Sequence, residues 1–200
     1  MFPLGSVLFP HAALPLHVFE PRYRALVEHC LKVEPEFGVV LIERGSEVGG
    51  GDTRFGVGTV ARIVEVSQFP DGRYALVSIG ISRLRVHEWL PDDPYPLATV
   101  EVLDDPIAGT DAVDARDAVE RDLRRVLALA TELGAAVAPG DVRLDQDPVR
   151  AAFEACALAP IGSLDAQRLL ELDDPVERLV RLETLLVETA ELLDLRLGDA

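Results

Sequence analysis

The residues that could carry out chemistry fit no complete cofactor motif. Gly56, Gly58 and Ala61 match the Gly-x-Gly-x-x-Gly/Ala spacing of dinucleotide-binding loops, but such loops need a helix N-terminus after the glycines to receive the pyrophosphate. Because β-branched residues follow Gly58, we expect a strand there and no cofactor. The glycine-rich stretch 49–52 lacks the Gly-Lys-Ser/Thr ending of a P-loop, so we expect a loop without ATP.

A hydrolase of the nucleophilic type would need a serine or cysteine beside a base. No Gly-x-Ser-x-Gly signature occurs in the sequence. A Ser-Lys dyad could use only Lys32, the single lysine, and with Glu34 and Glu36 nearby it should be an ordinary charged ammonium. We therefore expect no enzyme activity, and a peptidase with an unrecognised active site is the alternative.

Metal-binding spacings are also missing. The four histidines, at positions 11, 17, 29 and 87, form no His-x-x-x-His or His-Glu-x-x-His pattern. Cys30 and Cys156 belong to no Cys-x-x-Cys pair, so we expect two reduced structural thiols and no metal. The acidic pairs 92–93 and 104–105 adjoin prolines and should be solvated turn residues rather than catalytic carboxylates.

The charge distribution restricts the possible partners. The formal net charge is -16, and residues 1–105 hold nine Lys or Arg against fifteen Asp or Glu, so we expect no nucleic acid and no anionic membrane as partner. The first nineteen residues are uncharged, but prolines at positions 3, 10 and 15 break any helix long enough to cross a bilayer, which predicts a buried strand. Since no secretory signal pattern is present, we expect a cytoplasmic protein.

The elements that would position these residues fall into two halves. β-rich runs predict strands at 37–42, 57–66, 74–81, 84–90 and 97–103. Asp71 and Gly72 lie between two of these runs, where glycine can supply the positive φ of a hairpin turn, so the sheet should be mostly antiparallel. One helix is expected over residues 22–33. Its sheet-facing residues should be Tyr23, Leu26, Val27, Cys30 and Leu31.

Residues 104–110 are polar and rich in turn-forming residues. After them the spacing of apolar residues changes from two to about 3.6, which is typical of helices. A long helix is expected over 111–133, then a loop over 135–146. Asp147 and Asp174 each precede a proline and should cap two helix starts, and Ser163 should cap a shorter helix between them. The last helix should pack inside a small bundle, with an oligomer or partner contact as the alternative. Its apolar stripe is Leu179, Leu182, Leu186, Ala190, Leu193 and Leu197.

Several separated segments, taken in order, match one known family. The first joins Leu8-Phe9-Pro10 to Glu20-Pro21-Arg22-Tyr23. The others are residues 37–45, 47–49, 58–63 and 71–73, Gly80 with Arg83, and in the helical half 158–160, 167–172 and 177–179. Over these segments the chain resembles the N-terminal, substrate-binding domain of Lon protease.

This resemblance implies an α+β fold. Residues 1–105 should form a PUA-like pseudo-barrel of mostly antiparallel strands with one helix, and residues 111–200 a C-terminal helical bundle. In full-length Lon this domain precedes an ATPase and a Ser-Lys peptidase, and neither has its motifs in this sequence. We therefore expect a free-standing bacterial form without ATPase or peptidase parts.

The expected function is noncatalytic recognition of unfolded or exposed polypeptide segments, or of a partner protein. Aromatic side chains on a sheet could anchor such a segment, although packing in the core is their commoner role. The candidate residues are Phe19, Tyr23, Phe69, Trp89 and Tyr95. A PUA-like RNA-binding protein is a further alternative, because fold does not fix function.

Overall fold

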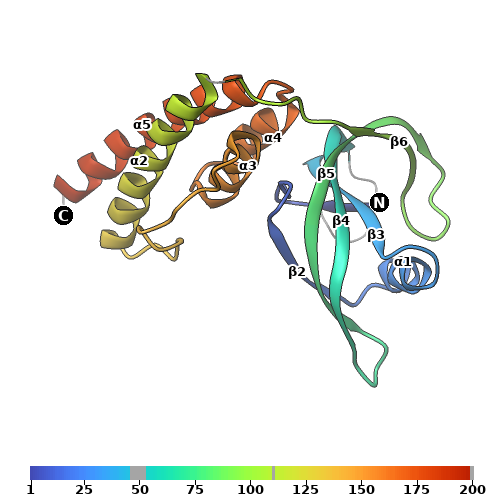
Figure 1. The fold of residues 1–200 in the computed structure, drawn as a ribbon. Helices are drawn as coiled ribbons and strands as arrows, with labels where there is room; N and C mark the ends of the chain where they lie inside the picture. Colours follow the sequence, from blue (N-terminus) through green and yellow to red (C-terminus); the bar gives the residue numbers. More distant parts are fainter. Residues whose placement is uncertain (46–52, 110, 199–200) are drawn as a thin grey trace. The chain divides into compact units, whose positions relative to one another are not determined.

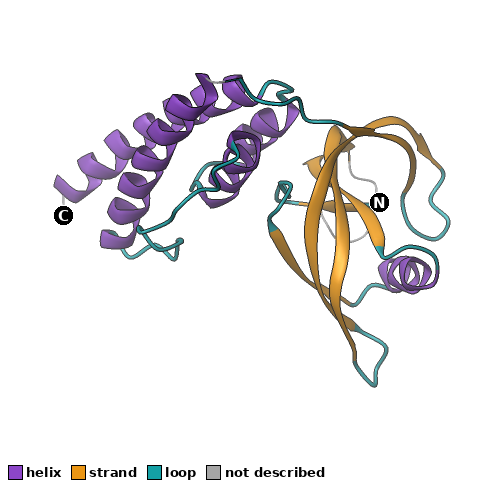
Figure 2. Ribbon diagram, viewed as in Figure 1, coloured by secondary structure: helices purple, strands orange, loops and turns teal. Residues whose placement is uncertain are grey.

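In the computed structural model, the described residues are 1–45, 53–109 and 111–198. Strands occupy the first half of the chain and helices α2 to α5 the second (Figures 1 and 2). The chain divides into two units, Met1–Asp104 and Asp105–Ala200, which are considered one at a time below. The glycine-rich stretch 49–52 and the segment 47–49 lie outside the described residues.

The first unit is a mixed α+β structure with a six-stranded sheet. Its elements are β1 (Phe2–Leu4), β2 (Ala13–Val18), α1 (Pro21–Lys32), β3 (Glu36–Arg44), β4 (Thr53–Gln68), β5 (Tyr74–Leu90) and β6 (Leu97–Leu103). The strand order is β1-β3-β4-β5-β2, and β6 also pairs with β5. Only the β1–β3 pairing within this sheet is parallel, so the prediction of a mostly antiparallel sheet is confirmed.

β5 is one long strand, whereas the sequence predicts two, at 74–81 and 84–90. Ser82 and Arg83 remain in the ladder with β4. On its other side β5 pairs first with β2 and then with β6. The interruption in the apolar pattern therefore marks a change of neighbouring strand and not the end of a strand.

The turn between β4 and β5 forms where the sequence predicts it. Gly72 has a φ of 81°, and its N–H donates to the carbonyl of Phe69 at 2.9 Å. The N–H of Arg73 donates to Asp71 Oδ1 at 3.1 Å, and this bond is the main cause that lowers the pKa of the Asp71 carboxyl. A β-carbon on Gly72 would displace the guanidinium of Arg24, which is the end of a flexible side chain, so the positive φ is the main reason for glycine at this position.

The glycines that resemble a dinucleotide fingerprint lie inside β4. Gly58 pairs with Val40 of β3, and a β-carbon on it would overlap the carbonyl oxygen of Val39. A β-carbon on Gly56 would meet nothing within 4 Å. β4 continues after these glycines and no helix begins there. Gly58 therefore allows two strands to approach closely and does not form a pyrophosphate-binding loop.

Helix α1 covers the sheet and supplies part of its core (Figure 1). Four of the five predicted inward residues are buried: Tyr23, Leu26, Val27 and Cys30. The prediction for Leu31 is wrong, because its side chain is 44% exposed. Leu31 lies about 100° around the helix from Cys30, which turns it away from the sheet. The Cys30 thiol donates to the carbonyl of Glu36 at 3.2 Å.

The second unit has four helices and no strand among residues 105–109 and 111–198. They are α2 (Asp111–Glu132), α3 (Pro148–Leu158), α4 (Ser163–Glu171) and α5 (Pro175–Gly198). Helix α2 packs along α5, and α3 contacts both. The predicted inner face of α2 is confirmed as buried: Val119, Leu123, Val126, Leu127 and Ala130. The stripe of α5 is buried through Ala190, while Leu193 and Leu197 are only half-buried.

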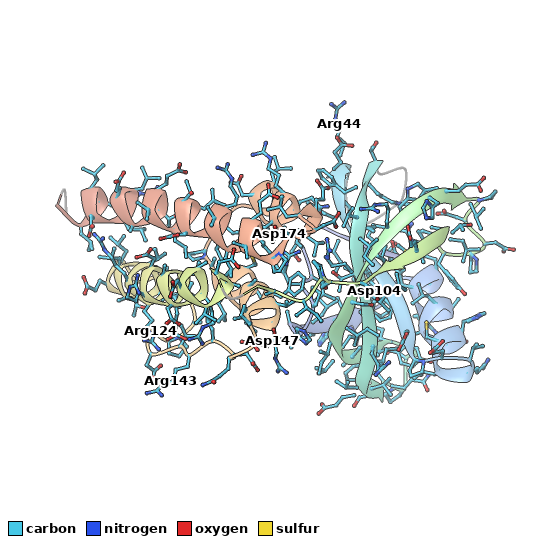
Figure 3. The ribbon with its side chains drawn as sticks, turned by 45° about the horizontal axis from the view of Figure 1, so that its top comes forward. Arg44, Asp104, Arg124, Arg143, Asp147 and Asp174 are labelled. Carbon is cyan, nitrogen blue, oxygen red and sulfur yellow. The ribbon has the colours of Figure 1, made fainter. Side chains whose placement is uncertain are left out.

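Two of the three predicted helix caps are confirmed (Figure 3). Asp147 accepts from the N–H of Val149 at 3.0 Å, and Asp174 accepts from the N–H of Val176 at 2.8 Å. The prediction for Ser163 is wrong, because Gly162 is the N-cap and Ser163 is the first helical residue. Glycine is itself tolerated at an N-cap, so α4 begins without a side-chain hydrogen bond.

The predicted loop between α2 and α3 is held in place by side chains of α2. Arg124 Nε donates to the carbonyl of Val142 at 2.7 Å, and Figure 3 shows Arg124 on the side of α2 near this loop. Glu120 accepts from the N–H of Leu144 at 2.8 Å. These bonds satisfy backbone groups that have no partner within a helix or strand.

Arg178 of α5 is a fully buried charged residue. Its Nε donates to the carbonyl of Leu169 at 3.0 Å, and its Nη2 donates to the carbonyl of Leu172. The guanidinium lies 4.2 Å from the centre of the Phe153 ring, and Nη2 is 3.8 Å from Asp105 Oδ1. Arg178 thereby satisfies carbonyls at the C-terminal end of α4, which the helix itself leaves without partners.

Candidate functional site

A cavity of about 430 Å³ opens beside the β4–β5 hairpin of the first unit. Its lining residues come from the end of β2 and from the hairpin: His17, Val18, Phe19, Phe69, Arg73 and Tyr74. Phe19 is 56% exposed and Phe69 is 41% exposed, so two aromatic rings are in contact with water at this cavity. The volume lies within the range of protein ligand sites.

A smaller cavity of about 110 Å³ adjoins the first one. Both are lined by His17, Val18 and Phe19. The remaining walls of the smaller cavity are Phe2, Leu4, Leu16, Glu20 and Tyr23. We call the two cavities together the β2 groove.

The pairing of β2 with β5 creates this groove. Val18 lies opposite Tyr74, and Tyr74 lies opposite Gln68 of β4, so the end of β2 lies beside the turn end of the hairpin. Phe19 and Phe69, one residue beyond each strand, are thus brought to one cavity although fifty positions separate them in the sequence.

The groove has few charges, and those it has are paired. Arg73 Nε lies 2.7 Å from Asp71 Oδ2, and its guanidinium lies 5.7 Å from the centre of the Phe69 ring. Glu20 pairs with Arg22 at 3.2 Å. Burial, with a further contribution from Glu28, raises the pKa of Tyr74, so its hydroxyl is neutral at physiological pH. Apolar contact is therefore the main interaction that the groove offers.

Three of the five candidate residues line the groove. Phe19 contacts both cavities and Phe69 the larger one. Tyr23 lines the smaller cavity but is only 3% exposed, and its ring stacks on Phe2 with centroids 4.1 Å apart. Tyr23 thus forms a wall of the cavity rather than an accessible anchor.

The other two candidate residues line neither cavity. Trp89 lies near the end of β5, half-buried, with the guanidinium of Arg54 4.6 Å from its ring centre. Tyr95 is half-buried against the core of the first unit, edge-on to His29 with ring centroids 6.3 Å apart. The structure therefore does not bring these two rings to the groove.

Sequence reasoning does not find His17, Val18, Arg73 and Tyr74. They are ordinary neighbours of two exposed aromatics, and their shared cavity depends on a pairing between strands about sixty residues apart. The sequence could point to these residues through their position near the two candidate aromatics: Val18 precedes Phe19, and Arg73 ends the turn that begins at Phe69.

The described residues that line the groove include no serine, cysteine or lysine. In residues 1–45, 53–109 and 111–198, no three or more His, Cys, Asp or Glu residues are grouped so that they could hold a metal ion. Within the same ranges, no helix has both the length and the apolar character needed to cross a bilayer. Both cysteines are buried and unpaired, and burial raises the pKa of the Cys156 thiol to about 12.

Comparison with known proteins assigns the chain to a family. The family model of the substrate-binding domain of ATP-dependent protease La (Lon) matches residues 1–188. The chain belongs to the Lon substrate-binding domain family. The Lon protease of Trichlorobacter lovleyi is 27% identical over 95% of this chain, and that of Desulfovibrio desulfuricans is 30% identical over 92%.

The chain spans about a quarter of the length of these Lon proteases, with 24% of the first and 21% of the second covered. Solved structures of Lon N-terminal domains match over nearly their whole length. The Lon N-terminal domain protein from Xanthomonas campestris is 28% identical with a TM-score of 0.65, covering 90% of this chain and 94% of that one. The N-terminal domain of Mycobacterium avium complex Lon protease has a TM-score of 0.66 at 18% identity, with 94% and 96% covered, and shows the shared fold.

Proposed function

We propose that this member of the Lon substrate-binding domain family recognises apolar segments of unfolded polypeptides in the β2 groove and catalyses no reaction there. The observation that carries the proposal is the pair of exposed rings, Phe19 and Phe69, at one cavity. Family membership supports a protein substrate as the partner. The groove supplies apolar surface, and its described lining residues include no serine, cysteine or lysine, which supports recognition without chemistry.

The energy available in the groove is that of apolar burial. Covering an apolar side chain completely is worth about 1.5–3 kcal/mol. A client side chain in the larger cavity would also cover the exposed parts of Phe19 and Phe69. One or two such anchors suit a module that binds many unfolded segments weakly and releases them.

The architecture and the setting of this activity are part of the proposal. We propose that the sheet unit is a PUA-like pseudo-barrel domain over residues 1–105 and that residues 111–200 form a separate helical bundle domain. Two buried, unpaired thiols suit a reducing cytoplasm. The net charge of -16 supports polypeptide partners over nucleic acid or anionic membranes.

The test uses an unfolded protein as probe. Reduced, carboxamidomethylated α-lactalbumin carrying fluorescein would be titrated with the chain at physiological salt, and binding followed by fluorescence anisotropy. We expect saturable binding that Phe19→Ala and Phe69→Ala each weaken by at least about fivefold, as for an interface anchor worth about 1 kcal/mol. Folded α-lactalbumin should not compete.

Val64→Ala is the matched control. Val64 is an apolar residue of β4 that is 48% exposed and lines neither cavity. It should leave the affinity unchanged. Absence of binding by the wild-type chain would refute recognition, and an equal loss for Val64→Ala and Phe69→Ala would show that binding is not centred on the groove.

A further inference from the structure

β2 is a terminal strand of the sheet, because β5 is the only strand it pairs with in the described part of the chain. β1 is the terminal strand at the other end of the path. Residues of both strands line the smaller cavity of the β2 groove, namely Phe2 and Leu4 from β1 and Leu16 with His17 and Val18 from β2. The outer edge of β2 therefore borders the groove.

The hydrogen-bonding groups on that edge can be assigned from the ladder. In an antiparallel pair, successive residues point their backbone groups alternately towards the partner and away from it. Gly80 donates to the carbonyl of Ala12 at 3.0 Å, so Ala12 faces β5, and the residues at odd positions of β2 face away. The N–H groups of Ala13 and His17 lie on the outer edge, and Pro15, which has no N–H to give, lies between them.

The outer edge is unpaired by any strand among residues 1–45, 53–109 and 111–198. Such an edge presents donors and acceptors at the spacing that an added strand requires. Alternate side chains of an extended segment lie on one face, about 6.6–6.8 Å apart. Two adjoining cavities that share His17, Val18 and Phe19 fit two such side chains, a large one beside Phe69 and a small one beside Leu4.

Charge decides the chemistry of the occupant. No Asp, Glu, Lys or Arg occurs before Glu20, so β2 carries none of these side chains. The two charged residues that line the groove, Arg73 and Glu20, are already paired with Asp71 and Arg22. A charged side chain entering either cavity would lose water without gaining a free counter-charge, which is costly. The groove therefore favours an uncharged segment.

We propose that an extended, uncharged, apolar segment of an unfolded polypeptide adds to the outer edge of β2 as a further strand and places alternate side chains in the two cavities of the β2 groove. This inference depends on the proposed function and adds the binding mode and the class of segment. The N–H of His17 donates to a backbone carbonyl of the segment, and the carbonyl of His17 accepts from one of its N–H groups. Recognition then depends on backbone as well as on side chains.

The first experiment compares two variants at one position. The probe is a capped, fluorescein-labelled peptide of sequence Thr-Val-Thr-Phe-Thr-Val-Thr. His17→Ala and His17→Pro both remove the imidazole, but only His17→Pro removes the outward N–H. Because that N–H is not used by β5, both variants should fold, as thermal melts would verify. We expect His17→Pro to bind the peptide about fivefold more weakly than His17→Ala, the effect of one net hydrogen bond.

The second experiment leaves the protein unchanged, so it holds even if His17→Pro does not fold. Two versions of the peptide are methylated on backbone nitrogens, one at the odd and one at the even positions. Only one set of nitrogens can face β2, so one version should lose binding at least about fivefold more than the other. Equal affinities for the two versions, or for the two His17 variants when both fold, would overturn strand addition.

The outcomes separate this inference from the proposed function. If unfolded α-lactalbumin binds and depends on Phe69, but the peptide binds without sensitivity to methylation or not at all, recognition stands and strand addition is wrong. If neither probe binds, both fail.

Discussion

Replacing Arg178 with methionine is the most informative test of how the helical unit is held together. The substitution keeps an unbranched side chain of similar length but removes the guanidinium. The carbonyls of Leu169 and Leu172 lose their donor, the Phe153 ring loses its cation, and Asp105 loses a cation 3.8 Å away.

The expected loss follows from these contacts. Hydrogen bonds to charged groups contribute about 1.5–3 kcal/mol each, and Arg178 donates to the carbonyls of Leu169 and Leu172. Part of this gain is offset in the wild type because burying the charge is itself costly. A buried acceptor that loses its hydrogen-bond donor costs about 1–3 kcal/mol, and Arg178→Met removes the donor to two such carbonyls, those of Leu169 and Leu172. We therefore expect Arg178→Met to lower the free energy of unfolding of the helical unit by about 3 kcal/mol or more.

Urea unfolding with two signals measures this effect. Far-UV circular dichroism follows the helices, and the fluorescence of Trp89, the single tryptophan, follows the sheet unit. Arg181→Met is the matched control, because Arg181 is an exposed arginine of the same helix and should cost no more than about 0.5 kcal/mol. If the two variants unfold at the same urea concentration by circular dichroism, the assigned role of Arg178 is wrong.

Three further predictions concern single positions. Gly58→Ala should destabilise the sheet unit by about 1–3 kcal/mol through overlap with the neighbouring strand, whereas Gly56→Ala should not, and equal melting temperatures for the two would contradict the close approach. Gly72→Val should cost about 1–3 kcal/mol because valine resists a φ of 81°, and an unchanged melting temperature would place the turn elsewhere. Cys156 has its pKa raised from 9.0 to about 12 by burial, so the unfolded chain loses this proton first and the free energy of unfolding should fall as pH rises above about 9. At neutral pH the native Cys156 thiol should resist Ellman's reagent, and rapid labelling before unfolding would contradict its burial.

The sequence predicted caps and turns correctly where neighbouring residues alone determine them. Asp147 and Asp174 cap helices because an acceptor before a proline is stabilising whatever surrounds it. Gly72 turns the hairpin because its conformation excludes most other residues. Ser163 misleads because the neighbouring Gly162 is also compatible with a cap, and the sequence does not rank the two.

Prediction from local patterns fails where a feature depends on pairing between strands that are far apart in the sequence. The interruption at Ser82 and Arg83 indicates the end of a strand, yet β5 continues because it exchanges β2 for β6. All five candidate residues are aromatic, so residue type alone does not tell an exposed anchor from a core residue. The pairing of β2 with β5 brings Phe19 and Phe69 to one cavity, where both are exposed, whereas the packing of α1 buries Tyr23 in the core.

The amino-acid sequence by itself determined the family, the division into a β-rich and a helical half, and most element boundaries, because these depend on residue types and on periods of two or 3.6 along the chain. The tertiary structure alone decided where an apolar surface stays in contact with water. That surface arises where the ends of β2 and the β4–β5 hairpin meet, and contact between segments more than fifty residues apart leaves no periodic signal in either one.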